Sequence, residues 1–182
     1  MIYFTSDLHL NHANIIKYNN RPFINVVEMN RQLIKNINSV VKSNDELYVL
    51  GDFAFAQKCQ TNEYLNDIQC KNVFLIKGNH DSFLRDRDNI ELKFKGIYQY
   101  YELNYNGIPF ILFHYPIAVW NKKHHSSIHL YGHVHTKEGG RRVPDELMHN
   151  SWNVNCEFWD YKPIPITYFI LHRNLEINKI EG

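Results

Sequence analysis

Residues 73–81 read VFLIKGNHD, an apolar run that ends in a glycine followed by an amide, an imidazole and a carboxylate. Aromatic and β-branched residues in a short run bounded by glycine are typical of a buried strand. Four other apolar runs end in the same way, before Asp7-Leu8-His9, Gly51-Asp52, His114 and Gly132-His133-Val134-His135. The chain therefore repeats one pattern, in which polar side chains follow a buried strand.

The spacing of apolar residues predicts the remaining elements. Residues 26–41 carry an apolar stripe at helical spacing, with Asn25 as N-cap and Glu28 completing a capping box. A shorter helix over 61–69 would be capped by Thr61. Buried strands are predicted at Ile2–Phe4, Leu47–Leu50, Val73–Ile76, Phe110–Phe113, Ile128–Tyr131 and Ile166–Leu171. This order favours an α/β beginning and a mixed sheet.

Length and composition limit the class of protein. A chain of 182 residues predicts a single domain over 1–182. Its 20 basic and 19 acidic residues give a net charge of +1, which provides no overall field to attract nucleic acid. The three cysteines form no CxxC pair, so neither a disulfide framework nor a cysteine zinc site is indicated. With no signal peptide or membrane-length apolar segment in the sequence, we expect a cytoplasmic protein.

Each polar cluster has a structural interpretation beside a metal-binding one. If its strand continues, Asp7 and His9 point to one face, as do His133 and His135, and either pair could chelate an ion or be surface polar residues. Asp52 could cap a turn, Asn79 could be a turn residue, and His114 could be a core histidine bonded to a backbone carbonyl. No cluster decides between the two interpretations by itself.

Considered together, the clusters favour a metal centre. Because carboxyl ends of strands in α/β sheets deliver loops to a common site, the five clusters are expected to converge. Carboxylates, imidazoles and one amide oxygen suit Mn, Fe, Zn, Ni or Co better than Ca or Mg. The candidate ligands exceed what one ion needs, and two ions sharing a carboxylate would use the surplus.

The ordered series DLH, GDF, GNHD, H and GHVH, spanning residues 7 to 135, resembles the calcineurin-like metallophosphoesterase superfamily. The segment 12–23, HANIIKYNNRPF, with EMN in the following helix, is similar to a small uncapped bacterial and phage branch. The resemblance implies a four-layer sandwich of two mixed β-sheets flanked by α-helices. It also implies a phosphoesterase with two divalent transition-metal ions, manganese being favoured.

The resemblance implies a ligand assignment as well. Metal one would be held by Asp7, His9, Asp52 and His135, and metal two by Asp52, Asn79, His114 and His133. Asp52 would bridge the ions together with a water or hydroxide. His80 of the GNHD motif would donate a proton to the leaving group.

The sequence departs from some relatives after Gly51-Asp52, where Phe53-Ala54-Phe55 replaces a further aspartate or a DRG run. The residue that orients the catalytic histidine and the phosphate-binding arginine of those relatives are therefore missing. Asp81 is the candidate for orienting His80, although adjacency gives it awkward geometry. Arg21 is either a phosphate contact or a solvated loop arginine. His12, close to the site in sequence, is a further candidate for the catalytic site.

A small phosphodiester or nucleotide is the first expectation for the substrate, because a short uncapped chain with little net charge offers no nucleic-acid-binding domain. A nuclease is the alternative, and only residues 121–125 and Arg141-Arg142 hint at a basic groove. The loop 115–127 is expected beside the site, and its Lys122, Lys123, His124 and His125 would meet a polyanion or be solvated. A non-catalytic metal-binding module is a third possibility. The residues leave the oligomeric state open.

Overall fold

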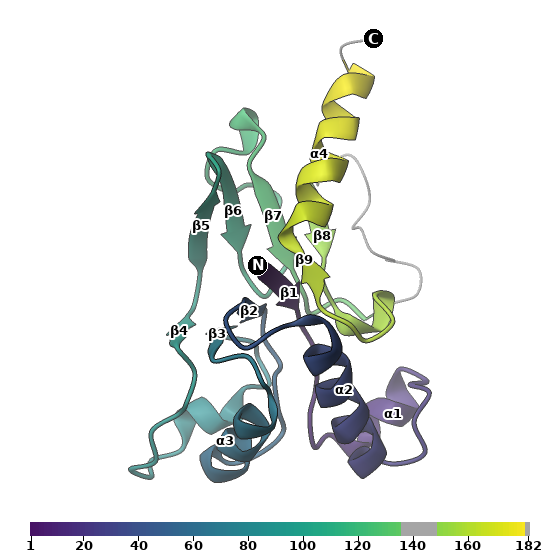
Figure 1. The fold of residues 1–182 in the computed structure, drawn as a ribbon, viewed down its shortest axis with the longest axis vertical. Coiled ribbons are helices and arrows are strands. Elements are labelled where there is room, and N and C mark those ends of the chain that lie inside the picture. The colour runs from purple at the N-terminus through teal and green to yellow at the C-terminus, as the bar shows by residue number, and fades with distance from the viewer. Residues whose placement is uncertain (136–148, 181–182) are drawn as a thin grey trace.

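The computed structural model describes residues 1–135 and 149–180, which form two β-sheets with helices packed against them (Figure 1). The first sheet has the order β4-β3-β2-β1-β9, and β9 is its antiparallel member. The second has the order β5-β6-β7-β8, in which β5 and β6 are antiparallel and the other pairs parallel. Both sheets are thus mixed, as the family resemblance implies.

The first sheet comprises β1 (Ile2–Thr5), β2 (Glu46–Val49), β3 (Asn72–Ile76), β4 (Gly96–Tyr98) and β9 (Ile164–Pro165). The second comprises β5 (Tyr101–Tyr105), β6 (Ile108–Leu112), β7 (Ile128–Tyr131) and β8 (Ser151–Asn153). The helices are α1 (Ala13–Tyr18), α2 (Val26–Val40), α3 (Lys58–Asp67) and α4 (Ile166–Ile180). Single turns of 3-10 helix are η1 (Ser82–Arg85), η2 (Lys123–His125) and η3 (Cys156–Phe158). In the described part of the chain, no helix is long and apolar enough to cross a membrane.

Helix α2 forms where its sequence predicts it. The Asn25 side chain accepts a hydrogen bond from the Glu28 backbone N–H at 3.0 Å. The Glu28 carboxylate accepts in return from the Ile24 N–H at 2.6 Å, one residue before the cap. Met29, Leu33, Ile34 and Ile37 form the buried stripe. A capped N-terminus and one apolar face are sufficient to define this helix.

Two sequence-based expectations about elements are wrong. Helix α3 begins at Lys58, so Thr61 lies inside it, buried, instead of capping it. The predicted strand Ile166–Leu171 is the beginning of α4, and the strand there is the two-residue β9 just before it. Ile166 and Phe169 are buried three residues apart while Leu171 is exposed, which is a helical pattern that a short apolar run conceals.

Successive side chains of the strands of the first sheet point to opposite faces, so they contribute to two separate hydrophobic cores. Leu47, Val49, Val73 and Leu75 face the helices α2 and α3, together with Leu33 and Ile37. Phe4, Tyr48, Leu50 and Ile76 face the second sheet, where Phe110 and Leu130 meet them and α4 adds Phe169. The rings of Phe4 and Phe110 stack across this inter-sheet core with their centroids 6.1 Å apart. This close-packed core fixes the position of one sheet relative to the other, and therefore also the relative positions of the loops at the strand ends.

Candidate metal centre

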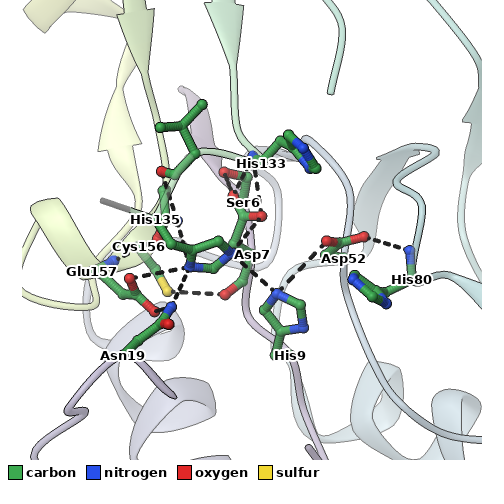
Figure 2. A network of polar contacts seen from close by, with 12 residues as sticks. Ser6, Asp7, His9, Asn19, Asp52, His80, His133, His135, Cys156 and Glu157 are labelled. Carbon is green, nitrogen blue, oxygen red and sulfur yellow. Dashed lines mark hydrogen bonds and ion pairs between the residues drawn. The ribbon is translucent and has the colours of Figure 1, made fainter. Parts of the chain in front are cut away.

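The carboxyl ends of β1, β2, β3, β6 and β7 deliver polar side chains to one place. Backbone hydrogen bonds join the loops: the Asp7 N–H donates to the Gly51 carbonyl at 3.0 Å, and the Gly132 N–H donates to the His114 carbonyl at 2.9 Å. Figure 2 shows side chains from both sheets pointing toward one another there. The structure brings together all seven residues that the sequence proposed as ligands: Asp7, His9, Asp52, Asn79, His114, His133 and His135.

The first group is Asp7, His9 and His135, whose ligand atoms lie within 4.8 Å of one another. His135 Nε2 is 3.4 Å from Asp7 Oδ1 and 3.4 Å from His9 Nε2. His9 is buried, and its Nδ1 has no hydrogen-bond partner among the described residues. Imidazole nitrogens that face each other beside a buried carboxylate suit a cation better than they suit hydrogen bonding.

The second group is Asp52, His114 and His133, again with ligand atoms within 4.8 Å. Asn79 Oδ1 adds to it, 2.9 Å from His114 Nε2 and 3.1 Å from His133 Nδ1. His114 Nδ1 is 2.8 Å from the Leu50 carbonyl oxygen, a contact that needs a proton on Nδ1 and leaves Nε2 free as a ligand. The core-histidine interpretation and the ligand interpretation of His114 are therefore compatible.

Asp52 lies between the two groups. Its Oδ2 is 3.6 Å from His9 Nε2 in the first group and 3.6 Å from His114 Nε2 in the second. Its Oδ1 accepts the His80 backbone N–H at 2.8 Å (Figure 2). One carboxylate shared by two mixed oxygen and nitrogen sets fits a pair of transition-metal ions.

The backbone reaches this geometry by leaving the strands. β1 ends at Thr5 and β7 at Tyr131, and left-handed φ angles follow at Asp7 (55°), His9 (51°) and His133 (68°). The strands do not continue through the D-x-H and H-x-H pairs, so the condition for a shared strand face is not met. His133 and His135 even belong to different groups. Left-handed conformations of non-glycine residues cost free energy and persist where surrounding contacts impose them.

Glycines of the motifs allow the loops to approach one another. A Cβ on Gly78 would collide with the Asp52 carboxylate, and a Cβ on Gly132 would collide with the side chains of Ser6 and Asp7. Only a residue without a side chain fits at these two positions.

The charges of the first group are strongly coupled. Burial alone would raise the pKa of Asp7, but the hydrogen bond and charge of His135 lower it to about 2. Burial alone would lower the pKa of His135, but hydrogen bonds to Asp7 and Glu157 raise it to about 9. Burial lowers the pKa of His9 to about 2. Without metal, His135 is thus the protonated imidazole of this group at neutral pH.

Metal affinity is therefore expected to depend on pH. Below pH 9 an ion must displace the proton of His135, so affinity at the first group should rise about tenfold per pH unit between pH 6.5 and 9, and then level off. Titration of chelator-treated protein with Mn²⁺ at several pH values measures this slope. Calorimetry in buffers of different ionisation enthalpy counts the proton released. An affinity that is flat over this range would contradict the assignment.

Asp81 does not orient His80, which corrects the sequence-based expectation. Its carboxylate accepts backbone N–H groups of Gly78 at 2.7 Å, Phe53 at 2.8 Å and Asp52 at 3.1 Å. Burial is the main reason why its pKa is raised to about 6. Asp81 therefore ties the loop after β2 to the loop after β3, both of which carry candidate ligands.

Arg21 is not a phosphate contact, which corrects a second expectation. Its side chain is completely buried. Nη1 donates to the Leu8 carbonyl at 2.8 Å and Nη2 to the Asp7 carbonyl at 2.7 Å. Its Nε donates to Glu157 at 2.8 Å. Arg21 thus stabilises the loop after β1 through hydrogen bonds to its backbone carbonyls, and its buried guanidinium is not accessible to a substrate.

Glu157 is a residue of the site that the sequence interpretation missed. Its Oε2 is 3.1 Å from His135 Nδ1, on the ring edge opposite the ligand nitrogen (Figure 2). The amides of Asn19 and Asn155 also contact this Nδ1, at 2.5 and 3.1 Å. The segment NVNC, residues 153–156, begins at the last residue of β8 and brings polar side chains to the end of a strand, as the other clusters do. That repeated pattern is the signal that could have identified Glu157.

His12 and His80 lie on either side of Phe55 at the edge of the site. The His12 ring stacks on Phe55 with centroids 4.0 Å apart, and Phe55 is 5.1 Å from His80. His80 is exposed, whereas His12 is partly buried and its Nδ1 has no partner among the described residues. The structure thus places both histidines near His9, with centroids 5.4 and 5.6 Å from it.

Only the beginning of the loop 115–127 meets the site. The Tyr115 ring lies 4.9 Å from His114 and 4.7 Å from His133. Residues 122–125 precede the start of β7, whereas the site follows its end. Lys123 folds back, with Nζ donating to the Ala118 carbonyl at 2.6 Å and lying 4.5 Å from the Trp120 ring centroid. Arg141-Arg142 lie outside the described residues.

Comparison with known proteins places the fold and the motifs in context. A family model described as calcineurin-like phosphoesterase matches residues 1–181. An uncharacterized protein of Methanocaldococcus jannaschii is 37% identical over 170 residues, which is 93% of this chain and 89% of that protein. The crystal structure of a protein of unknown function from Aquifex aeolicus has a TM-score of 0.71 and 30% identity, covering 99% of this chain and 98% of that one. The similarity thus extends over nearly the whole chain.

Proposed function

The chain belongs to the calcineurin-like phosphoesterase family, and from that premise we propose that it hydrolyses a small nucleotide-type phosphoester with two divalent metal ions. The family and the two ligand groups together support a metal-dependent phosphoesterase. The observation that carries the proposal is the position of Asp52, whose Oδ2 is 3.6 Å from a histidine of each group. Manganese is the favoured metal, and Fe, Zn, Ni or Co would suit the same donors.

Two ions at these groups would supply a nucleophile from water at neutral pH and counter the charge of the phosphoryl oxygens. The chain's own residues provide the rest. Glu157 and the Leu50 carbonyl fix the rings of His135 and His114 through Nδ1, so that each Nε2 faces the centre. His80 is exposed next to Asn79, and in this proposal it protonates the leaving oxygen.

The test is turnover of bis(p-nitrophenyl) phosphate by purified protein, after removal of metal and addition of Mn²⁺, Ni²⁺, Fe²⁺ or Zn²⁺. Metal-dependent release of p-nitrophenol is expected. If no metal restored hydrolysis of this ester or of a panel of nucleotides and short oligonucleotides, the chain would be a non-catalytic metal-binding module instead.

Replacing His80 by alanine is expected to slow the hydrolysis of esters with poor leaving groups more than that of esters with good ones. An alkoxide needs a proton as it departs, whereas p-nitrophenolate leaves as an anion. We expect kcat to fall about 100-fold or more on an alkyl phosphodiester and less than about tenfold on the aryl one. His124→Ala, an exposed histidine that precedes β7, is the matched control. Equal losses on the two esters would exclude a general-acid role.

The nuclease alternative has less support in the described residues. The basic run 122–125 lies before β7 and so does not extend the metal centre as a groove. A small ester therefore remains the favoured substrate.

A further inference from the structure

We propose that a small pocket beside Asn79 binds a second phosphate group of the substrate, one that is not hydrolysed. This inference rests on the proposed phosphoesterase function and narrows it to small nucleotide-type esters that carry two phosphates. The pocket has a volume of about 200 Å³, and its wall includes Lys77, Asn79, Arg85, Gln99 and Tyr115. Such a volume is smaller than a typical pocket for a whole drug-sized ligand, so it suits a single anionic group.

Two cationic side chains give the pocket its chemistry. Lys77 directly follows β3 and Arg85 ends η1, so they flank the GNHD segment on its two sides. Among residues 1–135 and 149–173, neither the Lys77 ammonium nor the Arg85 guanidinium has a hydrogen-bond or ion-pair partner. A guanidinium and an ammonium that both line a concave surface are a recurrent arrangement for binding phosphate.

The one acidic residue of the wall does not cancel this charge at close range. Asp81 is buried, and its two oxygens face the backbone N–H groups of Gly78, Phe53 and Asp52. Gln99 and Tyr115 contribute neutral polar groups to the wall. The pocket therefore presents two positive charges and hydrogen-bond donors to an anion.

The pocket adjoins the candidate metal centre through two residues, Asn79 and Tyr115. Asn79 belongs to both, because its Oδ1 lies 2.9 Å from His114 Nε2 and 3.1 Å from His133 Nδ1. Tyr115 also belongs to both, since its ring packs on His114 and His133. A phosphate in the pocket would thus be the neighbour of a phosphoryl group at the metal centre, as in an ester of a nucleoside bisphosphate.

The experiment compares two esters that differ by one phosphate: thymidine 5′-(p-nitrophenyl phosphate) and the same compound with a 3′-phosphate. The Mn²⁺-loaded protein is expected to prefer the 3′-phosphorylated ester at least about tenfold in kcat/KM. In the double variant Lys77→Gln, Arg85→Gln the ratio of the two values should fall to about one, whatever the absolute rates are. Lys71→Gln, Lys95→Gln removes the same charge before β3 and β4, away from the pocket, and should keep the wild-type ratio.

Binding is measured separately, so that the inference is decided even without turnover. Thymidine 3′,5′-bisphosphate should bind the wild-type protein more tightly than thymidine 5′-phosphate, and the double variant should bind both equally. The inference would be overturned if the wild-type protein showed a ratio near one, either of the two kcat/KM values or of the two affinities, or if the double variant kept the wild-type ratio. Turnover of either ester in that case would still support phosphoesterase activity. A further tenfold rise with an oligothymidylate ester would overturn the restriction to small substrates. If the Mn²⁺-loaded wild-type protein turned over none of these esters, the result would instead count against the proposed function.

Discussion

Replacement of Asp52 by asparagine is expected to lower kcat/KM at least about 1,000-fold while leaving the protein folded. The carboxylate oxygen Oδ2 lies 3.6 Å from a histidine of each ligand group, and an amide NH₂ there would bring no negative charge to either ion. The Oδ1 position can still accept the His80 backbone N–H, so the loops should keep their shape. Activity with saturating Mn²⁺, metal content and circular dichroism together measure the effect.

Asp67→Asn provides the control. Asp67 is exposed at the end of α3, so this substitution makes the same change of charge away from the site. It should keep wild-type activity and metal content. If Asp52→Asn bound two ions and turned over at the wild-type rate, the shared role of this carboxylate would have to be abandoned.

Replacement of Glu157 by glutamine is expected to weaken both the fold and the metal centre. Arg21 Nε and Glu157 form a buried ion pair at 2.8 Å, with side-chain exposures of 0% and 9%. Removing one partner leaves an uncompensated charge inside the protein, which should cost about 3 kcal/mol of unfolding free energy. Loss of the carboxylate behind His135 Nδ1 should also weaken metal binding about 10- to 100-fold.

Urea unfolding of the metal-free protein isolates the first effect, and Mn²⁺ titration of the folded protein measures the second. Glu63→Gln, an exposed position on α3, is the matched control and should change stability by less than about 0.5 kcal/mol. Wild-type urea stability together with wild-type Mn²⁺ affinity in Glu157→Gln would show that this carboxylate neither pairs with Arg21 nor supports His135 as described.

The ligands could be proposed from the sequence because their signal is local. A buried strand followed by glycine and polar residues, as in VFLIKGNHD, identifies both the element and the end at which function gathers. Which histidine joins which group is not local, and for His133 and His135 it followed only from the resemblance. The strand-face argument failed there because left-handed residues at Asp7, His9 and His133 end the alternation. Such angles depend on contacts with loops distant in sequence.

The roles of Arg21, Asp81 and Glu157 could not be predicted for the same physical reason. Each is decided by partners far along the chain, such as Arg21 with Glu157 or Asp81 with the Phe53 N–H. A charged residue in a loop is exposed in most proteins, so the sequence alone favours solvation or substrate contact. For Ile166–Leu171, an apolar run of six residues fits either element, and packing against Phe4 and Trp152 decides for the helix.

The stacked pair Phe4 and Phe110 determines more than stability. Each candidate ligand group takes its members from loops that follow strands of both sheets, so the spacing between the sheets also sets the spacing across the candidate metal centre. These two rings act as a spacer for that gap. A change of ring size at either position is therefore expected to alter the alignment of candidate ligands that neither ring touches.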